Sequence, residues 1–157
     1  MTDRTLLTTL EEQESRLVFA HFDESTAWSL GVALREAALA DNLPVAMSIR
    51  RNSQHLFHAA LPGSSADNDA WLARKCAVVD RYGQSSLRVG EQFRIKGGSF
   101  DVDSRLDTQL FAAHGGAFPI LVRGTGCIGT VAISGLPQLD DHQLVVDTLE
   151  AFLPQLR

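Results

Sequence analysis

The sequence predicts an α/β (α+β) domain in which helices pack on the faces of a mostly antiparallel, five-stranded sheet. Two observations indicate this fold. Apolar runs of strand length occur in pairs, each pair joined by a short polar or glycine-containing turn, which favours antiparallel hairpins. The segments between the pairs carry apolar residues at helical spacing. Hairpins alternating with helices indicate an antiparallel sheet with packed helices rather than a doubly wound parallel sheet.

The first third of the chain alternates between helical and strand patterns. Leucines at helical spacing predict an amphipathic helix over 3–14, and the compact apolar run at 16–22 predicts the first strand. Apolar residues again follow a helical stripe over 24–41. Asp23 can cap the start of this helix. The Asn-Leu-Pro sequence predicts its end, because asparagine tolerates a left-handed backbone and proline cannot continue a helix.

Two hairpins supply the other four strands. Alternating apolar and polar residues at 45–51 are followed, after a polar turn, by the run 55–61. The runs 117–123 and 127–134 have the strongest strand character in the chain. Pro119 cannot donate a hydrogen bond to a neighbouring strand, so it predicts a strand start, a bulge or an edge strand.

The remaining segments predict helices that lie between and after the hairpins. Helices are expected over 67–82, 85–93 and 141–152, and a loop with one helical turn over 94–110. Asp67 or Asn68 can cap the first of these helices, and Asp140 or Asp141 can cap the last. Lys75 lies inside the apolar stripe of the first helix, where a lysine either extends to water or faces a pocket.

A GxGxxG pattern at 124–129 separates the last two strands. In a dinucleotide-binding fold the third glycine opens a helix, and an acidic residue about 20 positions later ends a strand. Here the pattern continues as a β-branched run, and Asp147 lies in a helical pattern. The sequence therefore predicts a glycine-rich hairpin turn.

Charge is distributed unevenly along the chain. The net charge of −5 argues against non-specific binding to nucleic acid. The segment 50–96 nevertheless carries eight basic residues against four acidic ones. This asymmetry suits an anionic small ligand or a charge-complementary contact between subunits, and a solvated charged face is the alternative.

Length and composition predict a single domain over 1–157, with the N-terminal helix 1–15 as an appendage. No apolar run approaches the ~20 residues that span a bilayer, so no membrane partner is expected. The acidic N-terminus does not resemble a signal peptide. Cys76 and Cys127 lack CxxC or metal-ligand spacing, which predicts reduced, buried thiols and a cytoplasmic location.

Two histidine-containing sequences are candidate sites. His114 precedes Gly115 and Gly116, and adjacent glycines let a backbone approach a ligand closely or adopt positive φ. A tight turn with a hydrogen-bonded histidine is the alternative. The second sequence is Asp140-Asp141-His142, where acids at a helix start also complement the helix dipole.

The chain resembles the haem-degrading-domain family, the GlcG/HbpS-like proteins, and more closely its uncharacterised bacterial and fungal branch. The segments that carry the resemblance are AWSLG (27–31), LPV (43–45), LFHAALPG (56–63), DNDAW (67–71), RKCAVVDRYG (74–83), AAHGGAFPI (112–120) and IGTVAISGLPQLDDHQLVV (128–146). The resemblance implies a profilin-like α/β fold, assembly into a symmetric homo-oligomer and, in some members, haem or iron binding. For haem it makes three histidines candidate axial ligands: His114, His58 and His21. It also makes three basic residues candidate partners of the propionates: Arg74, Lys75 and Arg81.

Three functions are compatible with these observations. The first is a small-ligand-binding homo-oligomer for an anionic small molecule or haem, with no other metal site and a pocket at His114, Gly115, Gly116, Lys75, Arg74 and His58. The second is an assembly module without a small ligand. The third is an enzyme that uses His114 or His142 as a general base.

Overall fold

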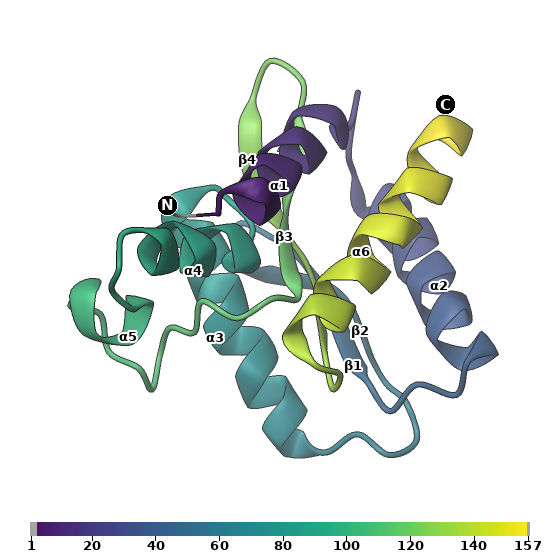
Figure 1. The fold of residues 1–157 in the computed structure, drawn as a ribbon. Helices are drawn as coiled ribbons and strands as arrows, with labels where there is room; N and C mark the ends of the chain where they lie inside the picture. Colours follow the sequence, from purple (N-terminus) through teal and green to yellow (C-terminus); the bar gives the residue numbers. More distant parts are fainter. Residues whose placement is uncertain (1–2, 157) are drawn as a thin grey trace.

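A four-stranded antiparallel sheet lies between two layers of helices in the computed structural model (Figure 1). The strands are β1 (Ala46–Arg51), β2 (Gln54–Ala60), β3 (Ala117–Val122) and β4 (Gly126–Ser134), in the order β2-β1-β4-β3. The structure describes residues 3–156. Residues 1, 2 and 157, at the ends of the expected domain and N-terminal helix, lie outside the described residues.

Helices α2 and α6 cover one face of the sheet, and α3 covers the other (Figure 1). The helices are α1 (Thr5–Arg16), α2 (Glu24–Ala40), α3 (Ala66–Tyr82), α4 (Ser86–Ile95), α5 (Phe100–Asp103) and α6 (Gln138–Phe152). Helix α4 packs beside α3 and carries α1 on its outer side. Within residues 3–156, no helix has both the length and the apolar character needed to cross a bilayer.

The two faces of the sheet carry side chains of different size. Large buried residues such as Ile49, Phe118 and Ile133 face α2 and α6 and form the main core. The opposite face presents the alanines Ala46, Ala117 and Ala132 to α3, in a second buried cluster with Leu72, Cys76 and Val79. Because alanine is small, α3 lies close to the backbone of the central strands. This close packing lets the Lys75 side chain of α3 reach the backbone at the end of β4.

The prediction of five strands is wrong, because the described residues form four. The expected strand at 16–22 is reduced to an isolated parallel bridge between Phe19 and Val122, with Phe19 N donating to Leu121 O at 2.7 Å. Arg16 still belongs to α1, and Asp23 already caps α2 by accepting a hydrogen bond from Thr26 N. Too few residues remain between the two helices to form a ladder.

Several local predictions are confirmed. Asn42 adopts the positive φ expected where α2 ends, at 53°. Gly83 has a φ of 67° at the end of α3. Gly124 and Gly126 lie at the antiparallel β3–β4 turn with φ of 80° and 97°, as a hairpin turn requires, and Gly129 lies within β4. A single helical turn, α5, occupies the expected loop at 94–110.

Two helix starts and one cysteine differ from expectation. Ser65, rather than Asp67 or Asn68, is the N-cap of α3, and its backbone N donates to Asn68 Oδ1 at 2.8 Å. Helix α6 begins at Gln138, after Pro137, so neither predicted aspartate caps it. Asp141 instead accepts hydrogen bonds from Lys75 and from the backbone N–H groups of Gly135 and Leu136. Cys76 is buried as predicted, whereas Cys127 is exposed at the hairpin turn.

Candidate functional site

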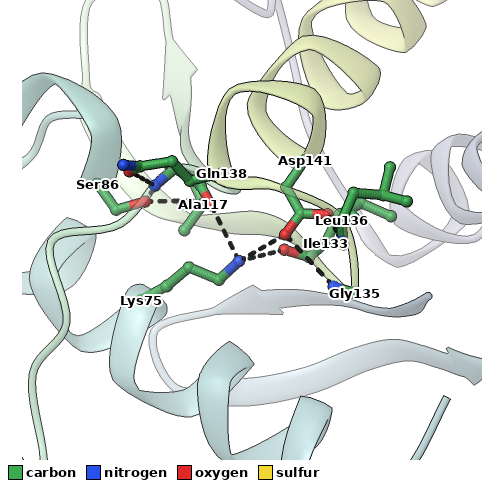
Figure 2. A network of polar contacts seen from close by, with 9 residues as sticks. Lys75, Ser86, Ala117, Ile133, Gly135, Leu136, Gln138 and Asp141 are labelled. Atoms are coloured by element: carbon green, nitrogen blue, oxygen red, sulfur yellow. Dashed lines mark hydrogen bonds and ion pairs between the residues drawn. The ribbon is translucent and has the colours of Figure 1, made fainter. Parts of the chain in front are cut away.

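The buried ammonium group of Lys75 joins α3, β4 and α6. Its Nζ donates to Gly115 O at 3.0 Å, to Ile133 O at 2.6 Å and to Asp141 Oδ2 at 3.2 Å. Figure 2 shows the Lys75 side chain extending from α3 toward Ile133 and Asp141. The Lys75 and Asp141 side chains are each 3% exposed. The alternative of a lysine extending to water is therefore wrong for Lys75.

The hydrogen-bond geometry determines the charge of this pair. Only the protonated amine has three protons, one for each acceptor oxygen around Lys75 Nζ. Asp141 accepts through both oxygens, from Leu136 N at 3.0 Å and Gly135 N at 3.3 Å as well as from Lys75. Burial lowers the pKa of Lys75 and raises the pKa of Asp141, and their mutual attraction opposes both shifts. The satisfied contacts hold the pair in its charged form.

The two glycines after His114 make room for this network. A Cβ on Gly116, whose φ is 135°, would lie 2.4 Å from both Lys75 Nζ and Ile133 O. A Cβ on Gly115 would lie 2.3 Å from Gln138 O, while Gly115 N donates to the Gln138 Oε1 atom at 3.0 Å. Both glycines therefore allow close packing of backbone against Lys75 and the start of α6.

His114 lies beside this network with its side chain exposed. Its ring stands at an angle to Trp71, with centroids 5.2 Å apart, and the Arg74 guanidinium lies 4.0 Å above the Trp71 ring. Within residues 3–156, neither ring nitrogen of His114 forms a hydrogen bond. The alternative prediction, a tight turn with a hydrogen-bonded histidine, is therefore wrong. Guanidinium, indole and an unbonded imidazole thus form one surface cluster.

Two cavities meet at His114. The first, the Lys75 cavity, has a volume of about 270 Å³ and is walled by Trp71, Lys75, Gly115, Ser134 and Asp141, among others. The second, the Glu91 cavity, has a volume of about 400 Å³ and lies between α1, α4 and the start of α6. His114 and Gln138 contribute to both cavities. Cavities that enclose small molecules have volumes of about 300–1,000 Å³, so a ligand in the Lys75 cavity stays partly exposed.

The structure brings together four of the six predicted ligand-binding residues. His114, Gly115 and Lys75 line the Lys75 cavity, and Gly116 packs directly against Lys75. Arg74 lines neither cavity, but its guanidinium lies over the ring of Trp71, which lines the Lys75 cavity. His58 is separate: it belongs to β2, pairs with Asp69 at 2.7 Å and lines neither cavity.

The other residues that sequence reasoning named lie elsewhere. His21 and Arg81 line neither cavity. His142 is 3% exposed, and its Nε2 lies 2.7 Å from Gln13 Oε1 of α1. Burial lowers the pKa of His142 to about 4. His142 therefore ties α6 to α1, and the general-base hypothesis is left with His114.

Sequence reasoning missed Gln138 and Trp71, and it grouped Asp141 with His142 rather than with Lys75. An aspartate near a helix start has a local explanation as a cap, and nothing in its neighbours points to a lysine 66 residues away. Trp71 carries one usable signal, since it lies four residues before Lys75 and three before Arg74 on the same helix. Within residues 3–156, no group of three or more His, Cys, Asp or Glu side chains is placed to hold a metal ion.

An antiparallel sheet with helices on both faces defines an α+β fold rather than a dinucleotide-binding fold, whose sheet is mostly parallel. The chain belongs to the haem-degrading HbpS-like family, whose model matches residues 22–150. This confirms the resemblance inferred from the sequence. Helix α1 precedes the matched residues.

Close relatives share most of the chain. A UPF0303 protein of Streptomyces coelicolor is 57% identical over 144 residues, which cover 92% of this chain and 91% of that protein. A UPF0303 protein of Rhizobium etli is 46% identical over 153 residues, which cover 98% of this chain and 93% of that protein.

Solved structures share the fold. The Ybr137w protein is 32% identical with a TM-score of 0.88, over 96% of this chain and 90% of that one. HbpS is 16% identical with a TM-score of 0.65, over 85% and 90% of the two chains. PduOC, solved as a haem complex, is 21% identical with a TM-score of 0.65, over 86% and 95%. At these identities the last two comparisons show the fold alone.

Proposed function

We propose that this protein binds a small anionic ligand at the Lys75 cavity and the adjoining surface, and that haem is the ligand to test first. The observation that carries the proposal is the exposed His114 imidazole, which lies at the junction of two cavities without a hydrogen-bond partner within residues 3–156. The family match and the solved PduOC haem complex direct the choice of haem.

The residues at the site fit a haem group in part. A neutral imidazole is a common axial ligand, and His114 has both nitrogens available for that role. The Arg74 guanidinium can pair with a propionate, because its contact with the Trp71 ring leaves N–H groups unused. Lys75 does not fit the predicted role, since three protein oxygens already use its protons. Bound haem would supply an iron centre, with His114 as its axial ligand.

Titration with haemin tests this proposal through absorbance. The full-length protein is expected to shift the Soret band to a saturable end point of one haem per chain. Replacing His114 with alanine removes the imidazole ligand, so the dissociation constant should rise at least about tenfold and the Soret maximum should move. Arg74→Ala should weaken binding less, because a partly exposed ion pair contributes little.

His55→Ala is the matched control, because His55 is also exposed but lies on β2, away from both cavities. It should titrate like the parent protein. Identical titrations of the His114→Ala and parent proteins would exclude His114 as the ligand. A parent protein that takes up haemin without saturation would exclude haem.

We also propose that the protein acts as a homo-oligomer, as the resemblance implies, and that it is cytoplasmic, as the spacing of its two cysteines predicts. The sheet supports this proposal, since β2 pairs with β1 on one side and has no partner strand on the other within residues 3–156. Trp28, 62% exposed on the neighbouring α2, lies against Phe57 of that strand. An unpaired edge beside an exposed aromatic ring is a common contact between subunits. Sedimentation of the ligand-free protein should give a species larger than a monomer, and a monomer would contradict the proposal.

A further inference from the structure

The Glu91 cavity has an apolar wall and a charged wall. The apolar wall is formed by Leu6 of α1, Leu87 of α4, Phe100 of α5 and Leu139 of α6. The charged wall carries Glu91 and Arg94 of α4 and Asp101 of α5. With a volume of about 400 Å³, the cavity can enclose a small organic molecule. A ligand that fits it has an apolar body and at least one charged group.

The exposure of the charged side chains decides the sign of that group. Glu91 is 5% exposed, and its carboxylate accepts a hydrogen bond from the Nε of Arg94. The Arg94 side chain is 61% exposed, so water surrounds the part of its guanidinium that does not contact Glu91. Charges in water are screened much more strongly than buried ones. The field inside the cavity is therefore dominated by the Glu91 carboxylate.

Asp101 contributes a second carboxylate to the lining, so the cavity wall holds two acidic side chains and one basic side chain. Asp101 is exposed, as Arg94 is, so water screens both of these charges. The buried carboxylate of Glu91 therefore decides the sign of the charge inside the cavity.

We infer that the Glu91 cavity is a second ligand site, which binds an organic cation: an ammonium group on an apolar body. The ammonium group pairs with Glu91, and the body lies against the leucines and Phe100. This site adjoins the proposed anion site at His114 and Gln138, but Trp71 and Lys75 line only the Lys75 cavity. It is also not contained in the family match, since Leu6 lies before residue 22.

Three probes of equal size and different charge test the inference: benzylamine, benzyl alcohol and benzoate. Each is titrated into the full-length, ¹⁵N-labelled protein while amide shifts are followed by NMR. Benzylamine should shift the amides of Gly90 and Gly98, which line the cavity, and should bind at least about tenfold more tightly than benzyl alcohol. Equal affinities, or tightest binding of benzoate, would overturn the inference.

Two variants of opposite sign separate the charge effect from a folding defect. Glu91→Gln keeps the shape of the side chain and should weaken benzylamine binding at least about tenfold. Arg94→Gln removes the competing cation and should tighten it by about twofold or more. Glu36→Gln, an exposed carboxylate on α2, should leave the dissociation constant unchanged. Weakening by both Glu91→Gln and Arg94→Gln would overturn the inference.

Discussion

Replacing Asp141 with alanine is expected to lower the free energy of unfolding by about 3–5 kcal/mol. The substitution leaves the Lys75 ammonium buried with two carbonyl acceptors but no counter-charge. It also removes the acceptor of the Gly135 and Leu136 backbone N–H groups. Urea unfolding followed by circular dichroism measures the loss.

A second substitution tests the physical reason. Adding Lys75→Met to Asp141→Ala removes the unpaired buried charge, so the double variant should be more stable than Asp141→Ala alone. Asp147→Ala is the control on the same helix, because Asp147 is exposed and bonds only Gln143 among the described residues. It should cost less than about 1 kcal/mol. A loss below that value for Asp141→Ala would show that the ion pair contributes little.

Acidification from pH 7 to pH 5 is expected to cost about 2 kcal/mol of stability through His142 alone. Burial lowers its pKa from 6.5 to about 4 in the folded protein. Between these two values the unfolded chain binds a proton that the folded protein does not. The stability contributed by neutral His142 is therefore complete above about pH 6.5 and is lost as pH falls toward 4.

Comparison with His142→Gln isolates this contribution. Burial raises the pKa values of Glu14 and Asp141, so these two groups increase the stability as the pH falls and oppose the effect of His142. The variant keeps both groups, so their effect cancels in the comparison. The free energy of unfolding of the parent protein minus that of His142→Gln should fall by about 2 kcal/mol from pH 7 to pH 5, as measured by urea unfolding. A difference that does not change with pH would mean that His142 is accessible to protons in the folded state.

The candidate site was predictable from the sequence where the signal is local. His114-Gly115-Gly116 stands out because paired glycines beside a titratable ring are unusual, and these residues do border the Lys75 cavity. The role of the glycines was not predictable, because Gly116 makes room for a lysine that lies 41 residues earlier in the chain. His58 was expected at the site and belongs to a different part of the sheet, where Asp69 holds it.

The sequence by itself determined the elements of this protein: α2, α3 and the two hairpins follow from apolar periodicity and local turn chemistry. The tertiary structure decided which polar side chains are buried and which groups they contact. The Lys75 side chain points into the protein because α3 packs on small alanines and because Asp141 of α6 lies within hydrogen-bond distance of its ammonium group. The run 16–22 fails to become a strand because two helices limit its length. Periodicity reports which face of an element is buried, but only the packed fold shows which charged groups meet on it.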